Sequence, residues 1–304
     1  MNFNGIWADK PKGTKLIVLG ALIFASSSIF LLLGSIIAGT FSDITGLSNL
    51  TNNLDDPNII NALKTLQGFQ HLGLFVVPPL LFAYICTSSG SDYLKLKNIP
   101  PLFSILIAIV TMLTCNPVIN WMVEVNELLK LPEFLSGLEA WMKEAEETAK
   151  VYTEAFLKME DLSDLLINIL IIALIPAIGE ELLFRGVLQN IFTNWTKSAH
   201  WGIVIAALLF SAMHMQFYGF LPRFAMGLLF GYLLIWSGSL WLPIICHFTN
   251  NGSAVLFTYL NDKGIVDFDS DTVGVNESTQ LYTPLAICAI GFFLYLIYRK
   301  HQNK

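Results

Sequence analysis

Long apolar runs separated by short polar segments dominate the pattern of this chain. Each run approaches the roughly 20 residues that an α-helix needs to cross the hydrocarbon core of a bilayer. The pattern predicts an all-α, polytopic membrane protein, a bundle of about eight transmembrane helices. The predicted spans cover residues 15–39, 70–88, 101–122, 164–184, 201–216, 219–236, 240–260 and 281–298.

Composition supports this class. The 304 residues are 54% hydrophobic and 13% charged, and a mean hydropathy of +0.61 is too high for a soluble domain of this size. The apolar core of the first run is too long for a signal peptide and no small-residue cleavage site follows it, so we expect a retained helix. Without repeats or low-complexity linkers, residues 1–304 are predicted to form a single membrane domain.

The positions of lysine and arginine predict the orientation. Short loops rich in these residues stay in the cytoplasm, and eight alternating spans place all of the basic clusters on one side. We therefore expect an integral protein with both termini cytoplasmic, and the short tails without a retrieval signal favour a bacterial plasma membrane. The basic clusters are Lys10, Lys12 and Lys15, then Lys95 and Lys97, then Lys197, then Arg299, Lys300 and Lys304; the opposite segments carry Asp43, Asp55, Asp56, Asp262, Asp267, Asp269, Asp271 and Glu277.

One long segment, residues 123–163, does not read as a span. Its leucines recur at helical spacing while its glutamates occupy other faces, which predicts an amphipathic helix at the membrane surface or over one end of the bundle. A structural lid is favoured over a substrate gate. The apolar positions are Leu131, Leu135, Leu138 and Met142, and the acidic ones Glu133, Glu139 and Glu144.

Charged residues inside an apolar run are costly and point to function. In the stretch IGEELLFRG, Glu181 and Arg185 are four residues apart, so they lie on one helical face and can pair. Glu180 points about 140° away from Arg185, and it is therefore the preferred reactive carboxylate. The competing interpretation is a charge cluster at a helix end, wetted by the cytoplasm.

Three more polar residues lie within apolar runs: His214, His247 and Asn251. Taken singly, an intramembrane histidine or asparagine more often forms a hydrogen bond between helices. Together with Glu180, they can activate a water molecule and stabilise a tetrahedral oxyanion. The chemistry that this set indicates is amide hydrolysis within the membrane.

A metal site is a second interpretation of the same residues. Glu180, His214 and His247 are suitable zinc ligands around an open water position. The compact H-E-x-x-H motif is absent, which favours catalysis that requires no cofactor, and both versions stay open. The cysteines lack C-x-x-C spacing and predict neither a disulfide framework nor a thiolate site; they are Cys86, Cys115, Cys246 and Cys288.

The three patterns resemble the motifs of the CAAX prenyl protease and bacteriocin-processing (CPBP, or Abi) family. They are E-E-x-x-x-R from Glu180 to Arg185, F-x-x-x-H from Phe210 to His214, and H-x-x-x-N from His247 to Asn251. The family-like catalytic core is expected at residues 164–260.

The resemblance implies an intramembrane endopeptidase whose cavity opens toward the cytoplasm. By analogy, Glu180 and His214 activate the water, and His247 and Asn251 form the oxyanion site. The family has been described both as metalloproteases and as glutamate-dependent enzymes. The implied substrate is a membrane-associated or lipidated protein or peptide; eukaryotic members act on prenylated C-a-a-X proteins, and bacterial members are linked to bacteriocin maturation or self-immunity.

Two local expectations concern helix geometry. In the predicted spans His214 lies roughly 10 Å deeper than His247 at 1.5 Å per residue, so the helix at 201–216 must start later, tilt, or break near the site. Pro176 lacks an amide proton and is expected to open its helix close to Glu180.

Other functions are less favoured. A non-catalytic scaffold or bacteriocin self-immunity protein would be expected to have lost a motif residue, and an ion-coupled transporter to contain internal repeats. Nothing basic enough for nucleic acid is present in a chain of net charge −6. The expected partners are the lipid bilayer and a membrane protein or peptide substrate, while the oligomeric state stays open.

Overall fold

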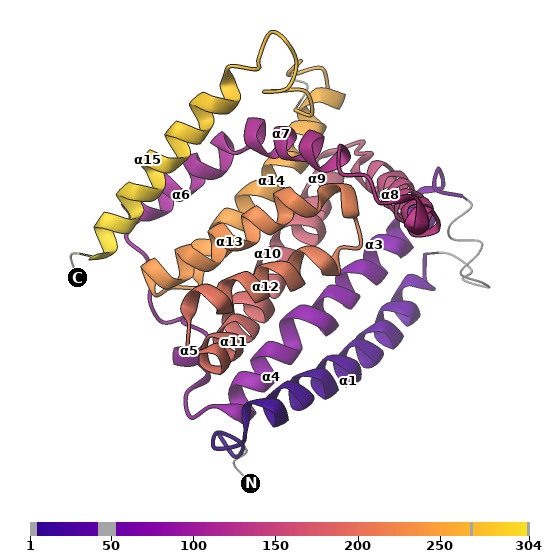
Figure 1. Cartoon of the computed structure of the whole chain (residues 1–304). Coiled ribbons are helices and arrows are strands. Elements are labelled where there is room, and N and C mark those ends of the chain that lie inside the picture. Colours follow the sequence, from indigo (N-terminus) through magenta and orange to yellow (C-terminus); the bar gives the residue numbers. More distant parts are fainter. Residues whose placement is uncertain (1–4, 42–52, 268–269, 303–304) are drawn as a thin grey trace.

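The computed structural model describes residues 5–41, 53–267 and 270–302, and over these residues the chain forms helices and turns without a strand (Figure 1). The prediction of an all-α protein is confirmed. Asp43, Asp269 and Lys304 of the predicted charge clusters lie outside the described residues. The helices are α1 (Lys12–Ala38), α3 (Pro57–His71), η1 (Leu72–Val76), α4 (Val77–Cys86), α5 (Gly90–Tyr93), α6 (Leu102–Thr114), α7 (Asn116–Glu127), η2 (Glu133–Leu135), α8 (Ser136–Leu157), α9 (Leu162–Asn168), η3 (Ile169–Leu174), α10 (Ile175–Glu181), η4 (Leu182–Leu188), α11 (Gln189–Thr196), α12 (Ala199–Met213), η5 (Phe217–Gly219), α13 (Phe220–Ser237), α14 (Trp241–Asp262) and α15 (Tyr282–Gln302).

All eight predicted apolar runs are helical, but not all of them qualify as spans. Within the described chain five helices are long and apolar enough to cross a membrane, and α6 with α7, bent by 44°, makes a sixth. The helix α12 has only 15 residues, and α14 carries a polar stretch from His247 to Ser253. Length and composition therefore support a polytopic membrane protein with five or six spans rather than the expected eight.

Two helices extend well beyond their predicted bounds. The predicted run 70–88 belongs to a continuous helix from Pro57 to Cys86, which Asp56 caps by accepting a hydrogen bond from the Asn58 amide at 2.9 Å. The run 164–184 continues to Thr196. The glutamates of IGEELLFRG thus lie in the middle of a helix rather than at its end, so the interpretation of a wetted terminal cluster is wrong.

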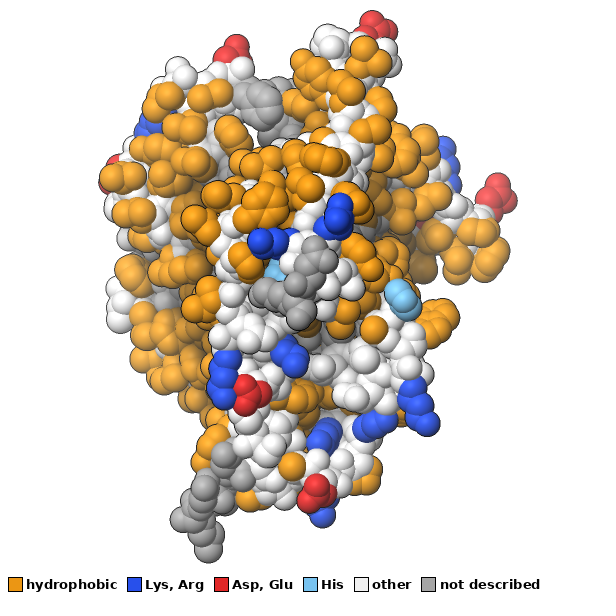
Figure 2. Space-filling view, turned by 90° about the vertical axis from the view of Figure 1, so that its left-hand side faces the viewer, with side chains coloured by type: hydrophobic (Ala, Val, Ile, Leu, Met, Phe, Trp, Pro, Cys, Tyr) orange, Lys and Arg blue, Asp and Glu red, His pale blue; other side chains and the backbone are white. Residues whose placement is uncertain are grey.

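The lysine and arginine clusters meet at one end of the bundle, which we call the basic end. At this end the Gly5 amide donates a hydrogen bond to the Tyr84 carbonyl at 2.9 Å, and the Leu240 amide donates one to the Lys95 carbonyl at 3.1 Å. Figure 2 looks onto this face, where lysine and arginine side chains gather. The basic end carries Lys10, Lys12, Lys15, Lys95, Lys97, Lys197, Arg299 and Lys300.

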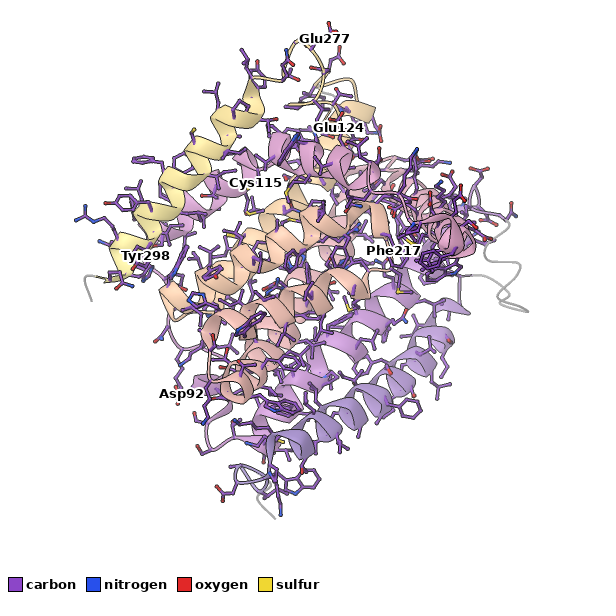
Figure 3. The ribbon with its side chains drawn as sticks, viewed as in Figure 1. Asp92, Cys115, Glu124, Phe217, Glu277 and Tyr298 are labelled. Carbon is purple, nitrogen blue, oxygen red and sulfur yellow. The ribbon has the colours of Figure 1, made fainter. Side chains whose placement is uncertain are left out.

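The opposite end, which we call the acidic end, holds the loops rich in aspartate and glutamate. Lys158 pairs with Asp55 at 2.9 Å, and the Asn116 side chain donates to the Ser270 carbonyl at 2.8 Å. Figure 3 shows Glu124, Phe217 and Glu277 toward this end, with Asp92 and Tyr298 toward the basic end. The acidic end carries Asp55, Asp56, Glu127, Glu146, Glu154, Glu160, Asp161, Asp262, Asp271 and Glu277.

The segment 123–163 forms the end of α7, the short η2 and the mostly exposed helix α8 (Figure 1). Because α8 begins at Ser136, Leu131 and Leu135 precede it, and Leu138 is exposed. Glu146 accepts a hydrogen bond from the Tyr218 amide at 3.3 Å, which fixes α8 against η5. Its location at the membrane surface stays a prediction.

Candidate active site

A buried ion pair lies next to the candidate site, on the same helix as Glu180. Glu181 and Arg185 are fully buried, with the Arg185 Nη1 atom 2.8 Å from Glu181 Oε1, one helical turn away. Arg185 also donates to the Gly227 carbonyl at 3.2 Å. Its guanidinium carbon lies 4.5 Å from the centre of the Phe210 ring and 5.3 Å from that of Phe230, contacts that favour a cation. Arg185 therefore links the helix of residues 162–196 to α12 and α13.

The same carboxylate orients His247 on α14. Glu181 Oε1 lies 2.9 Å from His247 Nδ1, and a carboxylate accepts, so Nδ1 carries the proton. The other ring nitrogen, Nε2, then faces Glu180, 3.9 Å from its Oε2 atom. Two adjacent glutamates thus have different tasks, since one positions the histidine and the other faces it.

Glu180 is buried, with 4% of its surface exposed, and its Oε2 atom has no hydrogen-bond partner among the described residues. Its Oε1 atom lies 3.6 Å from His71 Nε2. The His71 Nδ1 atom lies 3.1 Å from the Gln67 carbonyl of its own helix, to which it donates. A buried carboxylate oxygen without a partner is costly. Glu181 Oε2 also lacks a partner among the described residues, but of the two glutamates only Glu180 lines a cavity that could hold water or substrate.

Sequence reasoning missed His71. The predicted span 70–88 puts His71 at its edge, whereas the helix that carries it begins at Pro57, so that it lies near mid-helix. The Asp56-Pro57 pair was the available signal, because aspartate is a favoured N-cap and proline a favoured first helical residue. Read that way, the helix includes residues 57–71.

His214 is the C-cap of α12. Its Nδ1 atom lies 2.9 Å from the Phe210 carbonyl, which accepts the proton. The helix starts at Ala199, so the expectation of a later start is wrong; it ends at Met213, and Met215 has a left-handed φ of 54°. Of the expected alternatives, the structure therefore shows the end of this helix close to the site.

The side chain of Asn251 contacts the backbone carbonyl that Pro176 leaves without its helical partner. Pro176 has no amide proton for the Ile172 carbonyl, its α-helical partner four residues earlier. A π-helical stretch, Ile169–Leu174, precedes the proline, and the side chain of Asn251 donates to the Ile172 carbonyl at 3.1 Å. Pro176 therefore widens the helix without breaking it. The Ile172 carbonyl that it leaves free accepts one of the two side-chain N–H groups of Asn251.

These residues line one cavity. It has a volume of about 470 Å³, and Glu180, His214, His247 and Asn251 all contribute to its wall. It shares lining residues with a second cavity of about 810 Å³ at the acidic end. The shared residues are Val123, Thr153, Leu157, Gln216, Gly219, Arg223 and Ala254.

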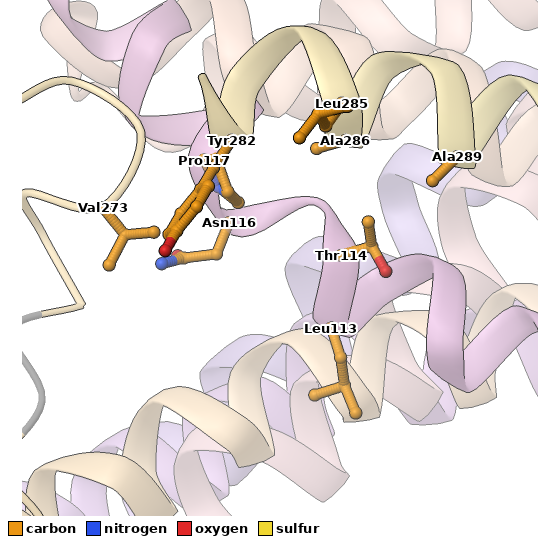
Figure 4. Close-up of a pocket in the computed structure, with 9 residues that line it drawn as sticks. All are labelled: Leu113, Thr114, Asn116, Pro117, Val273, Tyr282, Leu285, Ala286 and Ala289. Atoms are coloured by element: carbon orange, nitrogen blue, oxygen red, sulfur yellow. The ribbon is translucent and has the colours of Figure 1, made fainter. Parts of the chain in front are cut away.

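Another pocket, of about 450 Å³, lies where α15 passes the bend between α6 and α7 (Figure 4). It is lined mainly by apolar residues, including Leu113, Pro117 and Leu285, and by none of the candidate residues. The site is therefore assigned to the cavity beside Glu180.

Glu180, His214 and His247 are of the donor types that zinc prefers, and the zinc interpretation stays a prediction. Over the described ranges, no group of three or more His, Cys, Asp and Glu side chains is placed to hold a metal ion. No step of the chemistry below is therefore assigned to a metal.

Comparison with known proteins finds a family model and several relatives that match part of this chain. Residues 162–253, which include all six candidate residues, match the family model described as type II CAAX prenyl endopeptidase Rce1-like. The chain is 30% identical over 105 residues to the membrane-embedded CAAX protease MroQ of Staphylococcus aureus (strain USA300), covering 33% of this chain and 42% of that protein.

Two further relatives are uncharacterised. A 24.3 kDa protein of Escherichia coli is 28% identical over 149 residues, which cover 47% of this chain and 65% of that protein. YpbD of Bacillus subtilis (strain 168) is 34% identical over 85 residues, which cover 27% and 40%. The chain thus spans less than two thirds of the length of each of these relatives. No solved structure matches it significantly.

Proposed function

Since residues 162–253 belong to the Rce1-like family of CAAX prenyl endopeptidases, we propose that this chain is an intramembrane endopeptidase that hydrolyses a peptide bond of a membrane-associated protein or peptide. The observation that carries the proposal is Glu180. Its buried Oε2 atom lacks a hydrogen-bond partner in the described chain and the residue lines the cavity beside two histidines. Such a carboxylate can accept a proton from water.

In the proposed reaction, Glu180 removes a proton from a water molecule that the Nε2 atom of His214 orients. The water oxygen attacks the carbonyl carbon and the carbonyl oxygen becomes an oxyanion. As the intermediate collapses, the C–N bond breaks and Glu180 passes its proton to the departing amine. The products are one new carboxyl terminus and one new amino terminus.

His247 and Asn251 stabilise the oxyanion in this reaction. Because the Nδ1 proton of His247 is held by Glu181, Nε2 can donate only from the protonated ring. The second N–H of Asn251 adds a donor, and each donor of this kind is worth about 2.7–4 kcal/mol in a well-formed oxyanion hole.

The test is cleavage of a quenched-fluorescent peptide library by the purified protein in proteoliposomes. We expect activity from the wild type, none from Glu180→Gln, and unchanged activity from Glu160→Gln, a carboxylate at the acidic end outside this cavity. Activity that survives Glu180→Gln would contradict the assignment, and library-wide inactivity of a folded wild type would favour a scaffold or immunity role. Treatment with a chelator tests metal dependence, and we expect activity to persist.

A further inference from the structure

The two ends of the bundle differ in charge, and this difference predicts which end faces the cytoplasm. The short segments of the basic end contain the N-terminal lysines and the Lys95, Lys197 and Arg299 clusters. The acidic end also carries lysines, namely Lys130, Lys143, Lys150 and Lys158 on segment 123–163, Lys263 after α14, and Lys64 within α3. Its connecting segments nevertheless contain fewer lysines and arginines than the eight of the basic end. Because short basic loops remain cytoplasmic, the basic end is assigned to the cytoplasm.

Beneath Glu180, toward the basic end, the protein is tightly packed. Leu182, Phe184 and Val187 follow the glutamates and are buried in a core shared with Leu94 and Leu240. Arg185 and Gln189 are also fully buried on this side. Side chains rather than a passage therefore separate the site from the basic end.

In the other direction the site leads outward. The cavity beside Glu180 continues along Gln216 and Arg223, which also line the larger cavity. That larger cavity is bordered by Glu127 of α7 and Glu154 of α8, both exposed, and by Asp271. Its mouth is thus at the acidic end.

We propose that substrates enter this cavity from the extracytoplasmic side of the membrane. The substrate class, which rests on the proposed peptidase function, is then a peptide or membrane protein whose scissile bond is exposed outside the cytoplasm. A lipidated C-terminus displayed in the cytoplasm does not reach Glu180 by this route. The family resemblance implies a cytoplasmic opening, which is incompatible with a cytoplasmic basic end.

Sided cysteine labelling tests the proposal. In a full-length chain whose Cys86, Cys115, Cys246 and Cys288 are replaced by alanine, single cysteines are introduced as Gln216→Cys and Lys97→Cys. Gln216 lies in the passage shared by both cavities, and Lys97 is exposed at the basic end. A membrane-impermeant maleimide is applied to intact cells and to inside-out vesicles.

We expect Gln216→Cys to be labelled in intact cells and Lys97→Cys only in inside-out vesicles. The reverse pattern, or labelling of both positions from the cytoplasmic side, would overturn the proposal. Glu154→Cys, on the exposed surface of α8, reports the side of the acidic end if Gln216→Cys disturbs folding. Labelling needs no turnover, so the same experiment in the Glu180→Gln background separates failure of this proposal from failure of the peptidase assignment.

Discussion

Three imidazoles in and around the candidate active site are oriented in the same way. His71, His214 and His247 each direct Nδ1 to an oxygen that can only accept, namely a carbonyl for the first two and the Glu181 carboxylate for the third. Each ring therefore holds its Nδ1 proton and leaves Nε2 for other contacts. The Nε2 atoms of His71 and His247 lie 3.6 and 3.9 Å from opposite oxygens of Glu180, so that carboxylate lies between two imidazoles.

At this scale, spacing predicts some contacts and not others. The pairing of Glu181 with Arg185 follows from their separation along one helix. The approach of His71 to Glu180 cannot be read from spacing, because it depends on how the helix of residues 57–86 packs against α10. The Asn251 contact with the Ile172 carbonyl likewise requires the π-helical stretch before Pro176.

Replacing His71 tests its role as a positioning residue. His71 is absent from the cavity wall, so we expect His71→Ala to lower kcat while KM changes little. The loss should be roughly 100-fold, the scale of an effect from a misplaced reacting group. Steady-state kinetics in proteoliposomes measure the two constants.

His200→Ala is the matched control, because His200 contacts the Tyr232 hydroxyl at 3.0 Å away from the cavity. We expect its kcat to equal that of the wild type. Equal kcat values for His71→Ala and His200→Ala would show that His71 does not position Glu180.

The Arg185 guanidinium is expected to stabilise the fold. Arg185→Met leaves the buried Glu181 carboxylate without its cation, and breaking a buried pair in this way costs about 3–5 kcal/mol. Adding Glu181→Gln removes the uncompensated charge and should recover part of that stability. Thermal unfolding in detergent measures both, and an unchanged Tm for Arg185→Met would contradict the account.

At the scale of elements, helix identity is more predictable than helix boundaries. Each apolar run became a helix because its backbone must satisfy its own hydrogen bonds in a bilayer. Apolarity does not mark the ends. The helix of residues 57–86 begins with a stretch of mixed polar and apolar residues capped by Asp56, and that of residues 162–196 continues through the Glu181–Arg185 ion pair. The bend between α6 and α7, where Pro117 is an early helical residue of α7, also leaves the hydrophobic pattern unbroken.

The contact between α12 and α13 depends on Gly227. A Cβ atom built there would lie 2.8 Å from the Ala207 Cβ and 3.0 Å from its Cα. We expect Gly227→Ala to push the helices apart, shift the carbonyl that Arg185 contacts, and destabilise the protein by about 1–3 kcal/mol. Thermal unfolding is the measurement.

Gly291→Ala is the control for that change, since a Cβ at Gly291 meets nothing within 4 Å. It should leave Tm unchanged or slightly higher, because alanine favours helix more than glycine. Equal effects of the two substitutions would show that close helix contact at Gly227 is unimportant.

For the whole molecule, composition predicts a polytopic membrane protein, and the motifs predict which apolar runs meet around Glu180. Neither predicts which end of the bundle the cavity faces. The direction of the cavity depends on which end of the helix of residues 162–196 is surrounded by packed side chains, here the part from Leu182 to Gln189. It also depends on the passage bordered by α8 and η5. Charge distribution and cavity direction together give the extracytoplasmic access proposed above.

The most direct test of the central claim is a survey of new protein N-termini in membranes of the native host, comparing wild type with Glu180→Gln at matched expression and confirmed folding. The account predicts cleavage products that are present in the wild type and absent from the variant, and these products identify the substrate. Identical N-termini in the two strains would contradict it and would mean that the buried charges serve structure or partner binding.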